Sequence, residues 1–215
     1  MDSKNDKSIK KEKEEAKRVV NLGFGEEYEY EDLEKRRLYL NSEVDECVID
    51  SMVYHILRFN REDKEAGVAL ENRRPILLYL NTPGGNVIDG YGLIDAIRCS
   101  KTPVYTINQA LCASMGFLIF IAGHKRYSMP SAEFLMHDGS TFSFGSTSKV
   151  QDRMTFEKEQ LEVMTKNYVM DRTKIDEKMY DEKYRVEWYF LPEEAFKLGV
   201  VDYIVGRDCD IDDIV

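Results

Sequence analysis

An unbroken apolar run, Phe117–Ala122, limits what this chain can fold into more than any other segment. It is apolar on every side and much shorter than the roughly 18 residues of a membrane span, so it predicts a helix buried in a core. Val104–Asn108 before it reads as a short strand. Ser114 therefore lies where a strand turns into a buried helix, near the unpaired N–H groups of that helix. A hydroxyl at this position is either a nucleophile beside oxyanion donors or a group that only caps the helix. The segment alone leaves both interpretations open.

Composition excludes several classes of protein. The chain has 215 residues, 43% of them apolar and 33% charged, which is typical of one soluble domain with its own core. Its net charge of −10 argues against a nucleic-acid partner. The charged start of the chain predicts no signal peptide and no membrane segment, hence a cytoplasmic location. We expect no structural zinc, because the cysteines lie far apart at positions 47, 99, 112 and 209 with no CxxC pair. We expect no disulfide, because a chain of this length can build a core without one, and no cofactor.

Strand and helix patterns alternate in the first half of the chain. Pro75–Asn81 is apolar on both faces, which predicts a central parallel strand between the strands expected at 37–41 and 104–108. A stripe of apolar residues predicts a helix in each intervening segment. The second helix, Val87–Cys99, is expected to turn four residues inward: Ile88, Leu93, Ile94 and Ile97. This alternation indicates an α/β fold with a mostly parallel sheet.

The second half contains one unusually long helical pattern, Lys149–Thr173. Its apolar stripe is narrow, and such a helix packs either on its own sheet or on another subunit. Short strands are expected at 126–129, 133–137 and 200–205, and short helices at 175–181 and 192–198. We expect a mobile charged arm over 1–30, a single domain over 31–207 and a frayed acidic tail over 208–215.

Three loops should meet where the parallel strands end, which is where open α/β sheets bind ligands. They are the Gly84–Gly85 turn, the Ser114 turn and the loop after His137. His137 is a candidate general base because it ends an apolar strand, although a lone histidine there is more often structural. The glycines fit neither a GxxxxGK[ST] nor a GxGxxG phosphate loop. Cys112, two positions before Ser114, rules out a G-x-S-x-G elbow. The only carboxylate between Ser114 and His137 is Glu133, inside a strand, so an acid partner should follow His137.

Four blocks, in this order and spacing, resemble the proteolytic subunit of the Clp protease (ClpP): NTPGG at 81–85, QALCASMG at 109–116, FLMH at 134–137 and PEEAFKLGVVD at 192–202. The resemblance implies a ClpP/crotonase-like fold and a serine endopeptidase that cleaves unfolded polypeptides. It also implies rings of seven identical subunits, stacked as a 14-mer, and a hexameric AAA+ ATPase unfoldase as partner. Lys149–Thr173 would be the protruding handle helix, and the arm with Gly23–Gly25 the candidate axial gate.

The resemblance assigns roles residue by residue. Ser114 matches the nucleophile, His137 the general base, and the backbone N–H groups of Gly85 and Met115 the oxyanion hole. The family has aspartate where Glu187 stands, so Glu187 is the expected third member, with Asp181 as the fallback. The family's His-Gln-Pro run is replaced here by His-Asp-Gly from position 137, which puts the substrate-groove strand and ring contacts in question.

Three functions fit these residues. The leading one is an active, ATPase-assisted peptidase subunit. The second is a non-catalytic ring subunit, because Glu187 replaces the usual aspartate. The third is a crotonase-type enzyme acting on coenzyme A thioesters, which would leave Ser114 and His137 without a role.

Overall fold

The computed structural model of the chain describes residues 30–139 and 144–215, and Arg36–Val215 form one compact unit. Residues 30–34, which precede that unit, are helical. The expected arm over 1–30, with the candidate gate at Gly23–Gly25, lies outside the described residues except for Tyr30. Everything below concerns the compact unit.

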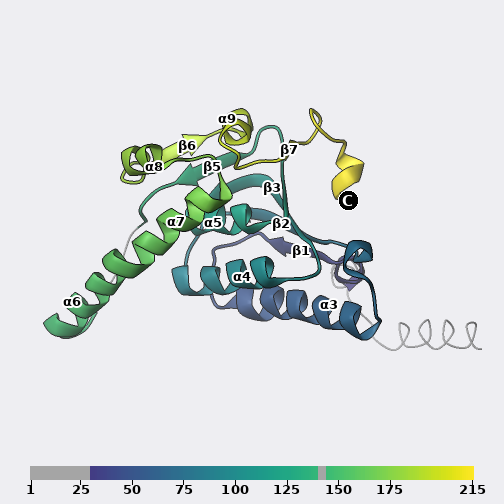
Figure 1. Ribbon diagram of the computed structural model, residues 1–215, viewed down its shortest axis with the longest axis horizontal. Helices are drawn as coiled ribbons and strands as arrows, with labels where there is room; N and C mark the ends of the chain where they lie inside the picture. The colour runs from purple at the N-terminus through teal and green to yellow at the C-terminus, as the bar shows by residue number, and fades with distance from the viewer. Residues whose placement is uncertain (1–29, 140–143) are drawn as a thin grey trace, which may run out of the picture. The chain divides into compact units, whose positions relative to one another are not determined.

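A parallel sheet forms the centre of this unit, with the strand order β1-β2-β3-β4-β7 (Figure 1). The bounds of these strands are β1 Arg37–Leu40, β2 Ile76–Thr82, β3 Val104–Ala113, β4 Lys125–Ser128 and β7 Tyr203–Ile204. Residues 76–80 are all buried, and β2 pairs in parallel with β1 and β3. The apolar segment Pro75–Asn81 therefore corresponds to a central strand, as predicted, and the predicted α/β class is confirmed.

Strand β3 is longer than the sequence pattern indicated, because it continues to Ala113. Leu80 pairs with Asn108 but Thr82 pairs with Cys112, so β3 holds two extra residues in this stretch. Such a bulge re-aims a strand. Beyond it, residues 111–113 pair in parallel with β5, Glu133–Met136, and β5 pairs in antiparallel fashion with β6, Trp188–Phe190.

Helices cover the sheet and one of them is almost fully buried. The helical segment before β2 comprises η1, Ile49–Val53, and α3, Tyr54–Glu65; α4 is Val87–Cys99. Helix α5, Met115–Ala122, contacts β3, α4 and α7, and every residue in it except Leu118 is buried (Figure 1). The prediction of a buried helix after Ser114 is confirmed.

The long helix runs without a break through α6, Thr147–Phe156, η3, Glu157–Leu161, and α7, Glu162–Arg172. We call these three segments the handle helix. None of the residues in α6 or η3 is buried, and Figure 1 shows α6 extending away from the sheet. Its other end is anchored, because Tyr168 donates to Leu118 O at 2.9 Å and Arg172 donates to Ile121 O at 2.8 Å.

Several predicted details are wrong. Ile88 is 68% exposed because it lies in the first turn of α4, whose buried side instead carries Leu93, Ile94 and Ile97. The helix expected at 175–181 is α8, Glu177–Lys183, which begins later because Asp176 caps it. The last strand is only Tyr203–Ile204, since the chain is still turning out of α9, Pro192–Lys197, before it.

The acidic end is folded, which corrects the expectation of a frayed tail. Residues Ile211–Ile214 form a short helix, η4, closed by a capping box between Asp210 and Asp213. Ile214 is 3% exposed and packs into an apolar cluster with Tyr79, Tyr127 and Val205. Tyr79 also donates its hydroxyl hydrogen bond to Ile214 O. Burial of one apolar side chain, Ile214, therefore outweighs the acidic composition of the segment.

Candidate active site

The Ser114 turn has an unusual backbone. Ser114 has φ 53° and ψ −120°, a conformation that costs a non-glycine residue on the order of 1–3 kcal/mol. The turn is held because Ser114 N donates to Leu135 O of β5 at 2.9 Å, and Phe117 N donates to Ser114 O at 3.1 Å. The Ser114 side chain makes no capping hydrogen bond to α5. The interpretation of Ser114 as a helix cap therefore fails, and its hydroxyl is left available.

The Gly84–Gly85 turn is packed directly against the Ser114 turn. A Cβ on Gly84, which has φ +96°, would lie 2.7 Å from both Ala113 O and Ser114 Cβ. The glycine turn is fixed from behind, because Val44 N donates to Gly84 O at 2.8 Å. In the described part of the chain, no acceptor is bonded to the N–H of Gly85 or of Met115. Both predicted oxyanion donors are thus available.

His137 and Glu187 are brought together by strand register. Met136 at the end of β5 is paired with Trp188 at the start of β6, so the next residues outward, His137 and Glu187, face each other. His137 Nδ1 lies 2.9 Å from Glu187 Oε1. The His137 side chain is 21% exposed and that of Glu187 is 58% exposed. Tyr189 donates a longer bond, of 3.3 Å, to the other carboxylate oxygen.

The second ring nitrogen of His137 is left unpaired. Nε2 is buried, and no group among the described residues is hydrogen-bonded to it. His137, Ser114 and Met115 all line one pocket of about 160 Å³. With Nδ1 turned to Glu187, a neutral imidazole carries its proton on Nδ1 and has a lone pair on Nε2. That is the state a general base requires.

Two other groups near this region are unsuited to the chemistry. Asp181, the fallback acid, is instead held by Lys166, whose Nζ lies 2.8 Å from Oδ1 and 3.0 Å from Oδ2. Cys112 is fully buried, and burial raises the pKa of its thiol well above the usual value. The thiol therefore stays protonated and does not compete with Ser114 as a nucleophile.

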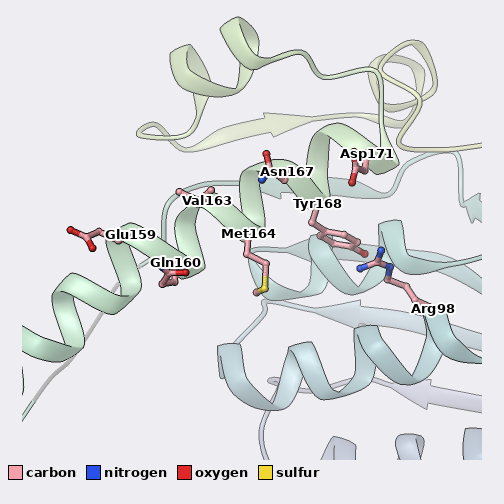
Figure 2. A pocket seen from close by; sticks show the side chains of 8 residues that line it. All are labelled: Arg98, Glu159, Gln160, Val163, Met164, Asn167, Tyr168 and Asp171. Carbon is pink, nitrogen blue, oxygen red and sulfur yellow. The ribbon is translucent and has the colours of Figure 1, made fainter.

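A larger hollow, of about 420 Å³, lies elsewhere, along the handle helix (Figure 2). Figure 2 shows Met164 and Tyr168 in its wall opposite Arg98 of α4, and the Arg98 guanidinium lies 5.2 Å from the centre of the Tyr168 ring. None of the predicted catalytic residues lines it. Its lining contains no serine, cysteine or histidine, so the smaller pocket is the candidate active site.

Among the described residues, no cluster of three or more histidine, cysteine or acidic side chains could hold a metal ion. Within the same residues, no helix combines the length and apolarity needed to cross a membrane.

Sequence patterns did not find strand β6, which sets the position of Glu187, nor the tyrosines that line the pocket from α4 and α8. Alternation over three residues is too short to identify a strand.

Comparison with known proteins identifies the family. The sequence pattern of the Clp protease family matches residues 26–208. An ATP-dependent Clp protease proteolytic subunit 3 from Synechococcus sp. (strain CC9605) is 31% identical over 181 residues, which cover 80% of this chain and 84% of that protein. The corresponding subunit 3 of Parasynechococcus marenigrum (strain WH8102) is 33% identical over 180 residues, covering 80% and 84%. A proteolytic subunit 1 from Frankia casuarinae is 31% identical over 182 residues, covering 81% and 79%.

The chain therefore belongs to the Clp protease family. Fold and family agree with the resemblance drawn from the four sequence blocks. They define a ClpP-type proteolytic subunit within a family of peptidases, which removes the main support for the coenzyme A thioester alternative.

Proposed function

We propose that this chain is a catalytically active serine endopeptidase subunit, with Ser114 as nucleophile, His137 as general base and Glu187 as the acid that orients it. The observation that carries the proposal is the 2.9 Å pairing of His137 Nδ1 with Glu187 Oε1. That pairing leaves Nε2 unbonded on a residue that lines the same pocket as Ser114. Asp181 is not assigned a role, because Lys166 holds it.

The reaction would proceed by acyl transfer. Ser114 Oγ attacks the carbonyl carbon of a peptide bond while its proton passes to His137 Nε2. The negative charge on the carbonyl oxygen is stabilised by the N–H groups of Gly85 and Met115. His137 then gives the proton to the leaving amine. A water deprotonated by the same nitrogen attacks the acyl ester, and the imidazolium returns that proton to Ser114 Oγ as the ester bond breaks. Glu187 stabilises the imidazolium that forms in both steps.

The oligomer is part of the proposal. The handle helix exposes apolar side chains that do not line the catalytic pocket: Met154 is 59%, Val163 51% and Met164 42% exposed. Such a stripe suits contacts between rings of identical subunits. We propose stacked heptamers that enclose the active sites and receive unfolded polypeptides from a hexameric AAA+ ATPase, in the cytoplasm. Fourteen chains of 25.0 kDa would give about 350 kDa by light scattering.

Cleavage of casein and of fluorogenic peptides tests the proposal. The Ser114→Ala protein should lose peptidase activity by several powers of ten, on the order of 10⁶ in other serine peptidases. Ser148→Ala, at an exposed serine in the first turn of the handle helix, is the matched control and should retain it. A wild-type protein that assembles but cleaves neither substrate would favour the alternative of a non-catalytic ring subunit. Full cleavage by Ser114→Ala would refute the assignment of the nucleophile.

A further inference from the structure

Tyr180 of α8 has a buried hydroxyl that the proposed reaction does not use. The residue is 3% exposed and lines the same pocket as Ser114 and His137. No hydrogen-bond partner for its hydroxyl exists among the described residues. Buried polar groups in folded proteins are almost always paired, so an orphaned hydroxyl in a pocket wall points to a ligand that pairs with it.

The position of Tyr180 is tightly fixed, so the orphaned hydroxyl does not reflect a loose side chain. Asp176 caps α8 by accepting from Met179 N at 2.8 Å. Lys166 of the handle helix ties α8 down, with its Nζ 3.0 Å from Glu177 Oε1. The ring of Tyr184 stacks on that of Tyr180, with centroids 5.0 Å apart and planes 19° apart.

Tyr91, which lines the pocket from α4, provides an internal comparison. Its hydroxyl lies 2.6 Å from Thr165 Oγ1. Thr165 already donates to Leu161 O at 2.8 Å, so Tyr91 is the donor and Thr165 the acceptor in their bond. The proton of Tyr91 is therefore committed, whereas that of Tyr180 is not. Burial raises the pKa of Tyr180, so its hydroxyl keeps its proton over the working pH range and is available as a donor.

The rest of the pocket selects against acidic side chains. Apolar groups, among them Phe117, Met136 and Val169, share its wall with the carboxylates of Asp138, Glu157 and Glu162. The one cation in the lining, Arg153, is paired with Glu157 at 2.6 Å. A volume of about 160 Å³ is roughly ten times what one water needs, so the pocket admits a side chain of several heavy atoms.

We propose that Tyr180 determines specificity by donating a hydrogen bond to the tip of the substrate side chain next to the cleaved carbonyl, and so favours glutamine there over methionine. The two side chains have similar length and shape, but only glutamine presents a carbonyl oxygen to the Tyr180 hydroxyl. This inference rests on the proposed function, because it takes the pocket at Ser114 as the site that receives the substrate. Methionine would fill the same apolar walls but leave the hydroxyl unpaired.

Binding and cleavage by the assembled protein test this separately. The probes are two alanine peptides that differ at a single residue, glutamine or methionine. Binding is measured by calorimetry with Ser114→Ala protein, which does not consume the peptide, and kcat/KM is measured with the active protein. One net hydrogen bond corresponds to a preference of roughly two- to tenfold for glutamine in both measurements. Tyr180→Phe should abolish the preference by weakening glutamine and sparing methionine.

Tyr91→Phe is the matched control, because it removes a hydroxyl from the same pocket that is already bonded to Thr165. It should change both peptides by the same factor and keep their ratio. Equal affinity for the two peptides, or a preference that survives Tyr180→Phe, would overturn the inference while leaving the peptidase assignment intact. Preferential binding of glutamine without any cleavage would support the role of Tyr180 and overturn the proposed catalytic function instead.

Discussion

Replacing Glu187 by glutamine removes the charge beside His137 with almost no change in shape. The wild-type carboxylate lies 2.9 Å from His137 Nδ1, where it stabilises the positive imidazolium formed during acyl transfer. The neutral amide cannot do so. We therefore expect Glu187→Gln to lower kcat with little change in KM, since the lost interaction belongs to the transition state.

The exposure of Glu187 sets the size of this effect. Opposite charges about 4 Å apart interact with about 1 kcal/mol in water and about 4 kcal/mol at a protein surface. The Glu187 side chain is 58% exposed, so solvent screens much of the interaction. We therefore expect Glu187→Gln to raise the activation free energy by about 1–3 kcal/mol. At about 1.4 kcal/mol per factor of ten, kcat should fall roughly 5- to 150-fold. A buried aspartate in a serine peptidase triad contributes about 10⁴-fold, so the expected loss is distinctly smaller.

Two further variants make the assay decisive, with kcat measured on a fluorogenic peptide. Glu187→Asp keeps the charge but is one methylene shorter, and should lose less than Glu187→Gln. Asp181→Asn makes the same acid-to-amide change at the carboxylate held by Lys166, and should retain kcat within about twofold. A larger loss for Asp181→Asn than for Glu187→Gln, or no loss for the latter, would refute the assignment of the third member.

Three other perturbations follow from the fold. Gly84→Ala places a Cβ 2.7 Å from the Ser114 turn and should lower kcat/KM about 10²-fold. The control is Gly67→Ala, at φ +65°, where an added Cβ meets no atom within 4 Å; it should lower stability and leave kcat/KM unchanged. Ile214→Ala should destabilise the protein by about 2 kcal/mol in urea unfolding, because Ile214 is 3% exposed, whereas Ile211→Ala, at a residue 55% exposed, should change it by less than about 0.5 kcal/mol. Burial lowers the pKa of His124 below 6.5, so unfolding takes up a proton and the free energy of unfolding should fall as the pH drops below about 6.5. His124→Gln should flatten this pH dependence, and an unchanged slope of the free energy of unfolding against pH would contradict the expectation.

The sequence patterns identified the elements that the hydrophobic effect determines locally. The strand at 75–81, the buried helix after Ser114 and the long charged helix all have residue patterns that no other structure accommodates well. Patterns misjudged the ends of elements, as with Ile88, because the first turn of a helix lies at the edge of the packed region. They also misjudged the acidic tail, where one buried isoleucine decides the outcome and composition does not.

Parts of the site depend on contacts that no local pattern contains. Ser114 and His137 were identifiable because both follow apolar strands, whose ends meet at one edge of the sheet. The pairing of His137 with Glu187, which are 50 positions apart in the sequence, depends on the register of β5 and β6. Only the family resemblance pointed to Glu187, and the structure supplies the distance. Nothing in the sequence marked Tyr180, because an unpaired hydroxyl is a property of the packed state.

Mass spectrometry after treatment with a fluorophosphonate probe tests the central claim most directly. The probe reacts with serines that an adjacent base activates, so the purified protein should gain one adduct per chain, mapped to Ser114. His137→Ala should abolish labelling, because the base is removed while the serine remains. No adduct under conditions where the protein is folded and assembled, or an adduct at Ser114 that persists in His137→Ala, would contradict the account.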